Sequence, residues 1–161
     1  MKVEEKVIVI TGAARGIGQE YARYFGSLGA RVVIADINDC AQTIELVRAE
    51  KGTAVCAKLD VASATSAMEM ARTALDAFGR IDALINNAAL YGGLKGGRFD
   101  MITEADWDAA MAVNVKGIWN CCKAVVPALR QAGGGSIVNM ASLAATYGMP
   151  YGLHYTSPRP P

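Results

Sequence analysis

The chain has 161 residues, 52% of them hydrophobic, and a formal net charge of +1. This length predicts a single domain, residues 1–161, that is large enough to bury a core. The near-neutral charge gives no reason to expect nucleic acid or a membrane surface as a partner, and no apolar run reaches the roughly 18 residues that span a bilayer. The charged start, Met1-Lys2-Val3-Glu4-Glu5-Lys6, lacks a signal-peptide core and favours a cytoplasmic protein.

Strand-like and helix-like patterns alternate along the chain. Short apolar runs rich in β-branched residues predict strands near residues 6–10, 31–35, 53–59, 81–85 and 136–140. Helical patterns cover segments near residues 17–28, 39–51, 63–78 and 104–131. This alternation predicts an α/β fold in which a Rossmann-type, doubly wound parallel sheet carries helices on both faces.

Glycine and proline mark the expected breaks between these elements. Pro127 is expected to kink or end the last helix, and Gly133-Gly134-Gly135 to turn the chain into the fifth strand. The glycine-rich stretch 90–99 is predicted to be a mobile loop at the carboxyl ends of strands, where open sheets bind ligands. Glycine and proline around Tyr151 favour a loop there, although three tyrosines spaced four apart would also suit one face of a helix.

The four cysteines, Cys40, Cys56, Cys121 and Cys122, show no spacing typical of a disulfide framework. The chain has one histidine, so a mixed cysteine and histidine zinc site is not expected, and no metal site is predicted. We therefore expect reduced, mostly buried thiols, as in a cytoplasmic protein.

A glycine-rich turn follows the first predicted strand. It lies where a buried strand leads into a helix, so its backbone N–H groups and the helix N-terminus favour an anion such as a pyrophosphate. The spacing is G-x-x-x-G-x-G rather than the more common G-x-G-x-x-G, and a turn that binds no ligand remains the alternative. The residues of this turn that we expect to bind a dinucleotide are Gly12, Arg15, Gly16, Ile17 and Gly18.

Asp36 ends the second predicted strand, about 20 positions after the glycine-rich turn. A carboxylate at this place accepts hydrogen bonds from ribose hydroxyls and repels the 2′-phosphate of NADP, so NAD is the expected cofactor and NADP is less favoured. Arg15 is a counter-indication, because an arginine in the turn could reach a phosphate. An Asx turn or a helix N-cap before Asn38-Asp39 is the alternative role for Asp36.

Together with the glycine-rich turn, four later segments resemble the classical short-chain dehydrogenase/reductase family, and the likeness covers nearly the whole chain. Asp60-Val61 resembles the family's adenine-contacting pair. Asn86-Asn87-Ala88-Ala89 resembles its N-N-A-G motif, with Ala89 in place of the usual glycine. Asn114 resembles the catalytic asparagine on a helix, and Ser142 and Tyr155 resemble the catalytic serine and tyrosine. The resemblance adds Asp60, Val61, Asn87 and Ala88 to the residues expected to bind the cofactor.

The resemblance implies an NAD(P)-dependent oxidoreductase that transfers a hydride between a nicotinamide and a secondary alcohol or ketone. Tyr155 would exchange a proton with the substrate oxygen, which a phenol does best when a cation stabilises the phenolate. Ser142 would hydrogen-bond that oxygen, and Asn114 would organise a water in the proton path. A helix cap is the alternative role for Ser142, and turn formation is the alternative for Asn86 and Asn87. His154 is expected to be a bystander.

The chain departs from the family pattern after Tyr155. The family places a lysine four positions later, where this chain has Arg159 followed by Pro160 and Pro161. Arginine keeps the charge but presents a planar fork and releases no proton, and the prolines disfavour helical geometry before them. By comparison with the family, we expect a chain truncated there, with the C-terminal strands missing. The alternative function is therefore a catalytically inactive nucleotide-binding protein. Family members form homo-oligomers, which leaves the assembly of this chain open.

Overall fold

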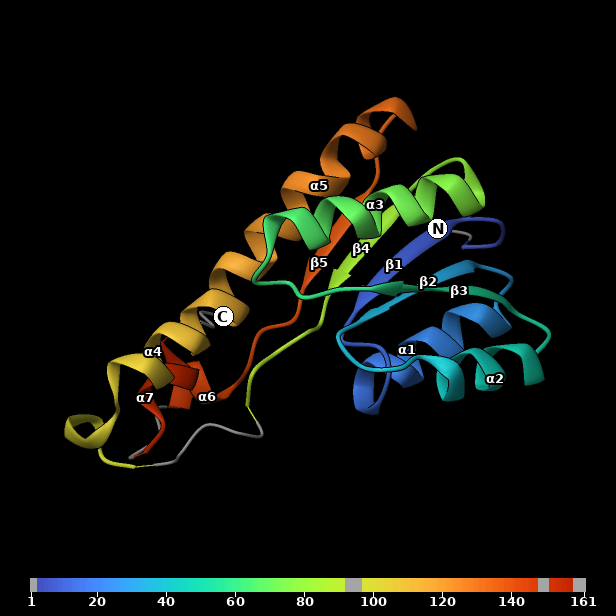
Figure 1. Ribbon diagram of the computed structural model, residues 1–161. Helices are drawn as coiled ribbons and strands as arrows, with labels where there is room; N and C mark the ends of the chain where they lie inside the picture. The colour runs from blue at the N-terminus through green and yellow to red at the C-terminus, as the bar shows by residue number, and fades with distance from the viewer. Residues whose placement is uncertain (1–2, 92–96, 148–150, 158–161) are drawn as a thin grey trace.

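The computed structural model describes residues 3–91, 97–147 and 151–157. Within them, parallel strands form one sheet in the order β3-β2-β1-β4-β5 (Figure 1). The strands are β1 (Val7–Thr11), β2 (Arg31–Asp36), β3 (Thr53–Lys58), β4 (Ala83–Asn86) and β5 (Ser136–Asn139). Each predicted strand is present, and the predicted Rossmann-type sheet is confirmed.

Helices cover both faces of the sheet, α1 and α2 on one and α3 and α5 on the other (Figure 1). The main helices are α1 (Gly16–Ser27), α2 (Ala41–Ala49), α3 (Ala64–Phe78), α4 (Glu104–Met111) and α5 (Gly117–Gln131). Alternate side chains of β1 enter the two cores: Val7 and Val9 pack on the α3 and α5 side, Ile8 and Ile10 on the other. A strand buried on both faces needs an apolar residue at every position, which explains the continuous apolar run.

The predicted helix over 104–131 consists of α4, one π-helical segment η2 (Ala112–Lys116) and α5. Pro127 lies inside α5 and the helix continues to Gln131, so the helix does not end at the proline, and the kink expected as the alternative stays a prediction. Buried side chains on both sides of the proline, Val125 and Ala128 among them, belong to the core between α5 and α3. This packing outweighs the one backbone hydrogen bond that proline removes.

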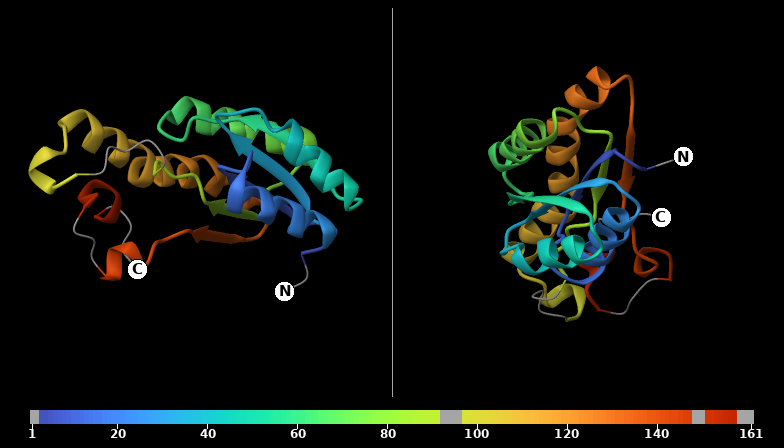
Figure 2. Two further views of the ribbon diagram at one scale, coloured as in Figure 1. Left: turned by 90° about the horizontal axis from the view of Figure 1, so that it is seen from below. Right: turned by 90° about the vertical axis from the view of Figure 1, so that its right-hand side faces the viewer.

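Shorter elements complete the described chain. They are η1 (Phe99–Met101), α6 (Ala144–Tyr147) and α7 (Leu153–Thr156), and α7 lies beside α4 (Figure 2). Tyr155 therefore lies on a helical turn, whereas Tyr151 and Gly152, where a loop was predicted, lie outside both short helices. Gly133 and Gly134 have positive φ and turn the chain into β5, as predicted. Residues 92–96, the centre of the loop predicted to be mobile, lie outside the described residues.

Cys40 and Cys56 form a disulfide, with Cα atoms 5.9 Å apart. The prediction of reduced thiols is therefore wrong for this pair. Cys40 precedes α2 and Cys56 lies in β3, so tertiary packing brings them within bridging distance although they are 16 positions apart. Cys121 and Cys122 are free, as predicted, and burial raises the pKa of the Cys121 thiol to about 12.

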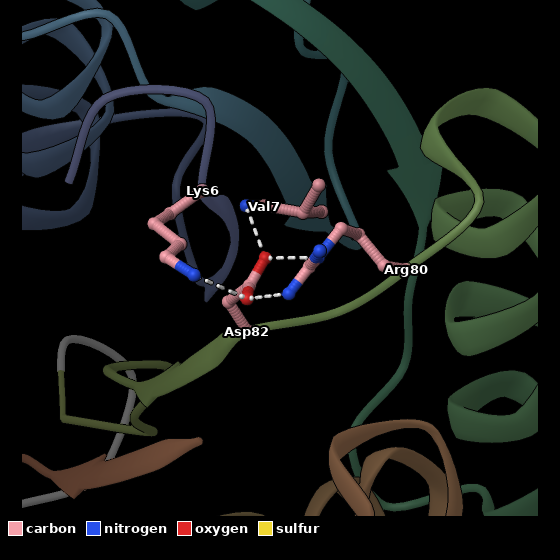
Figure 3. Close-up of polar contacts among 4 residues, drawn as sticks. All are labelled: Lys6, Val7, Arg80 and Asp82. Atoms are coloured by element: carbon pink, nitrogen blue, oxygen red, sulfur yellow. Dashed lines mark hydrogen bonds and ion pairs between the residues drawn. The ribbon is translucent and has the colours of Figure 1, made fainter. Parts of the chain in front are cut away.

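Asp82 joins the amino-terminal ends of β1 and β4 (Figure 3). Its carboxylate accepts hydrogen bonds from the Arg80 guanidinium at 2.6 and 2.9 Å, from Lys6 Nζ at 3.2 Å and from the Val7 N–H at 3.0 Å. Burial alone would raise the pKa of Asp82, but these hydrogen bonds outweigh it and hold the pKa below its usual value. The cluster stabilises the end of the sheet opposite to the carboxyl ends of the strands.

In the part of the chain that the structure describes, no helix has both the length and the apolar character needed to cross a bilayer. The same residues contain no group of three or more histidine, cysteine or acidic side chains arranged to hold a metal ion.

Candidate functional site

A cavity of about 630 Å³ opens at the carboxyl ends of β1, β2, β3 and β4. Its place follows from the topology: the chain builds outward from β1 to β3 and then crosses to β4 on the other side of β1. Such a switch point leaves a crevice between the loops that leave neighbouring strands in opposite directions. Nine residues predicted to bind the cofactor line the cavity: Gly12, Arg15, Gly16, Ile17, Asp36, Asp60, Val61, Asn87 and Ala88.

Two glycines of the turn are required by close packing. A Cβ atom on Gly12 would lie 2.7 Å from Ala88 Cα, and Gly12 also has a φ of +65°. A Cβ atom on Gly18, the remaining predicted cofactor residue, would clash with the Gly12 carbonyl oxygen. The glycines therefore let the turn after β1 pack directly against the turn after β4, and Gly18 supports the turn without lining the cavity.

The buried Asp36 carboxylate links β2 to the glycine-rich turn. Its Oδ2 atom accepts a hydrogen bond from the Ala14 N–H at 2.9 Å. Its Oδ1 atom accepts from the Asn38 N–H at 2.8 Å and from Asn38 Nδ2 at 2.9 Å. The Asx turn considered from the sequence is therefore present, and the same carboxylate also lines the cavity.

Thr11 ties the turn after β4 to the end of β1. Its hydroxyl oxygen accepts hydrogen bonds from the N–H groups of Asn87 and Ala88, each at 3.0 Å. Asn87 Nδ2 returns hydrogen bonds to the carbonyl oxygens of Thr11 at 3.0 Å and Gly12 at 3.1 Å. Asn87 therefore joins two cavity walls rather than forming only a local turn.

The Asp60-Val61 segment is held from the side of α5. Asn120 Nδ2 donates to the Val61 carbonyl oxygen at 2.9 Å, and Gly117 leaves room for the Val61 side chain. The Asp60 carboxylate accepts from the Ala62 N–H at 2.9 Å, which closes a local turn beside the cavity. This segment forms the wall that follows β3.

Asn114 is fully buried in η2 and fixes the loop that follows β4. Its Nδ2 donates to the Leu90 carbonyl oxygen at 3.2 Å, and its Oδ1 accepts from the Leu90 N–H at 2.9 Å. Since Leu90 and Tyr91 line the cavity, this amide shapes one of its walls. The water-organising role of Asn114 stays a prediction.

Tyr155 packs against Tyr91, which lines the cavity, and the centroids of the two rings are 4.6 Å apart. Ser142 is placed differently: its Oγ accepts from the Ala144 N–H at 3.2 Å at the start of α6, the capping role left open by the sequence. Ser142 is not among the described residues that line the cavity. Arg159 lies outside the described residues. His154 is fully buried, and in the described chain neither ring nitrogen has a hydrogen-bond partner.

Seven further lining residues were not among those predicted to bind the cofactor, because they are mostly apolar, although Ala89 belongs to the Asn86–Ala89 motif and Leu90 and Tyr91 begin the loop expected beside a ligand. They are Ile37, Asn38, Leu59, Ala89, Leu90, Tyr91 and Val113. Each lies within five positions after a strand or in η2, so their positions relative to the predicted strand ends were the available signal.

The sequence model of the short chain dehydrogenase family matches residues 6–158. The chain belongs to the short-chain dehydrogenase family. An uncharacterised oxidoreductase from Thermotoga maritima is 38% identical over 152 residues, which cover 93% of this chain and 59% of that protein. D-threitol dehydrogenase from Mycolicibacterium smegmatis is 36% identical over 158 residues, with 96% of this chain and 59% of that protein covered.

A solved structure from Sinorhizobium meliloti, described as a short-chain alcohol dehydrogenase, superposes with a TM-score of 0.91 at 29% identity. The match covers 98% of this chain and 62% of the other. This chain therefore spans about three fifths of the length of the relatives it matches.

Proposed function

We propose that this chain carries the cofactor-binding part of an NAD-dependent oxidoreductase acting on a secondary alcohol or ketone. The observation that carries the proposal is the cavity at the switch point, lined by the glycine-rich turn, Asp36, the Asp60-Val61 segment and the Asn87-Ala88 turn. The backbone N–H groups at the start of α1 suit the pyrophosphate of a dinucleotide. The N-cap of α1, Arg15, supplies no side-chain cap, so the first N–H groups of the helix are available to an anion.

The charge and hydrogen bonding of Asp36 favour NAD over NADP. A carboxylate has about four acceptor positions, and three of them are used by Ala14 and Asn38. One position remains for a ribose hydroxyl, whereas a 2′-phosphate would meet a fixed negative charge. Arg15 also lines the cavity and is the residue that could offset this repulsion.

A bound nicotinamide would accept or supply the hydride, and the chain's own residues would handle the proton. We assign the proton exchange to the Tyr155 phenol, which lies behind Tyr91 at the cavity. Asn114 holds the loop that carries Leu90 and Tyr91. Ser142 accepts from the Ala144 N–H and would donate its own hydroxyl hydrogen to the substrate oxygen. D-threitol dehydrogenase among the relatives makes sugar alcohols a sensible part of a substrate panel.

A nucleotide-binding protein without turnover is the second candidate, favoured by arginine at position 159. NADH absorbance, measured with a panel of secondary alcohols and ketones, separates the two. The oxidoreductase proposal expects turnover that Tyr155→Phe abolishes while NADH binding persists. Saturable NADH binding with no turnover on the panel, by the full-length protein, favours the second candidate.

A cytoplasmic location and a homo-oligomeric assembly belong to the same proposal. The Cys40–Cys56 bond counts against this location, because disulfides are more typical of an oxidising compartment. Imaging of the tagged full-length protein tests the location, and sedimentation tests the assembly.

A further inference from the structure

Two side chains outside the family's motifs hold the glycine-rich turn in place. Gln19 lies in the first turns of α1, and Thr43 is fully buried near the start of α2. Gln19 Nε2 donates to the Ala14 carbonyl oxygen at 3.1 Å and to Thr43 Oγ1 at 2.9 Å. Thr43 Oγ1 in turn lies 3.0 Å from the Ala13 carbonyl oxygen and 3.2 Å from that of Ala14.

The three hydrogens of this network account for three of its four contacts and leave the longest, from Thr43 Oγ1 to the Ala14 carbonyl oxygen at 3.2 Å, without one. The Gln19 amide has two, one for the Ala14 carbonyl and one for the Thr43 oxygen, and the Thr43 hydroxyl has one, for the nearer Ala13 carbonyl. The Ala14 N–H is taken by Asp36 at 2.9 Å. The peptide group between Ala13 and Ala14 is therefore held at both its oxygen and its N–H.

The hydrogen bonds of Gln19 and Thr43 to the turn, here called the clamp, also set the direction of the next peptide group. In a trans peptide the carbonyl and the following N–H point in opposite directions. Since Gln19 fixes the Ala14 carbonyl, the Arg15 N–H must point away from the clamp. Arg15 and Gly16 line the cavity, and Arg15 is the uncapped N-cap of α1. Neither Gln19 nor Thr43 is among the described residues that line it.

We propose that Thr43 and Gln19 are positioning residues for the pyrophosphate of the dinucleotide. They act through the backbone of the glycine-rich turn, by orienting the N–H groups that would donate hydrogen bonds to the anion. The inference rests on the proposed dinucleotide site and adds two residues that no motif of the chain identifies. It predicts that their loss weakens ligands that carry a pyrophosphate and spares ligands that lack one.

Matched variants at position 43 separate positioning from a general structural role. Thr43→Val keeps the shape but leaves the Ala13 carbonyl without its donor, so calorimetry should show the Kd of NADH and of ADP rising about tenfold. The Kd of adenosine should change less than about twofold, because adenosine carries no pyrophosphate for the oriented N–H groups to bind. Thr43→Ser keeps the hydroxyl and should restore NADH binding. Thr73→Val is the control, because that hydroxyl bonds within α3, to the Glu69 carbonyl oxygen.

A second readout uses the protein without ligand. Amide hydrogen exchange at residues 14–16 should be faster in Thr43→Val than in Thr43→Ser, and Gln19→Leu should add little to Thr43→Val because both remove one network. Equal weakening of adenosine and NADH, unchanged NADH binding in Thr43→Val, or unchanged exchange would each overturn the inference. Those results leave the proposed function intact if the unmutated protein binds NADH; absence of any NADH and ADP binding by the unmutated protein overturns both.

Discussion

The Asp36 Oδ2 atom accepts a hydrogen bond from the Ala14 N–H at 2.9 Å. The residue expected to select the cofactor therefore also anchors the turn expected to bind its pyrophosphate. This double role links the parts of the cavity expected to bind the ribose and the phosphates through one buried carboxylate, 22 positions from Ala14 along the chain.

Replacing that carboxylate should change cofactor preference as well as affinity. Asp36→Ala removes the acceptor for the ribose and for Ala14, so NADH affinity should fall about tenfold or more, whereas NADPH should lose less because a repulsion is also removed. Calorimetric Kd values for both cofactors provide the measurement. Asp76→Ala, which removes an exposed carboxylate from α3, is the charge-matched control. An unchanged ratio of the two Kd values would show that Asp36 does not discriminate between a ribose 2′-hydroxyl and a 2′-phosphate.

Two glycines of the same turn should respond differently to alanine. At Gly16 the φ of +61° is the main obstacle, and a Cβ atom would meet nothing within 4 Å, so alanine should cost about 1–2 kcal/mol of stability. At Gly12 the same backbone strain is joined by a clash with Ala88, so the loss should be larger by about 1–3 kcal/mol. Urea unfolding of both variants measures the difference. Equal losses would mean that the two turns are not packed as described.

Asp82 should make stability sensitive to acid. Its folded-state pKa is below the unfolded value, so its contribution is fully present above the unfolded pKa and is lost as pH falls through the folded pKa. Asp82→Asn should destabilise the protein by about 1–2 kcal/mol at neutral pH. The difference from the unmutated protein should shrink below about pH 4. Chemical unfolding across this range tests the prediction, and a constant difference would contradict it.

The Cys40–Cys56 bond predicts two reactive thiols in the unreduced, denatured protein and four after reduction. Reduction should also lower stability, by up to about 3 kcal/mol in the chain-entropy model for a loop of this length. A Cys40→Ala/Cys56→Ala variant is the control, since its Tm should not respond to reductant. Labelling of all four cysteines before reduction would show that the bond does not form.

The sequence predicted the sheet well because each strand is a distinct apolar run bounded by polar or glycine residues. β2, for example, was expected at 31–35 and spans Arg31–Asp36. Nine lining residues were also expected, because they belong to motifs at strand ends. The disulfide was missed because the spacing of Cys40 and Cys56 in the sequence does not reveal the tertiary contacts between α2 and β3 that bring them together. Thr43 was missed for the same reason: its partners Ala13 and Ala14 are 30 and 29 positions away.

The most direct test of the account is a calorimetric titration of the protein with NADH and with NADPH. The cavity beside the glycine-rich turn and Asp36 predicts saturable, one-to-one binding of NADH that is tighter than binding of NADPH. Equal or tighter binding of NADPH would contradict the role given to Asp36. Absence of binding by either dinucleotide would contradict the assignment of the cavity itself.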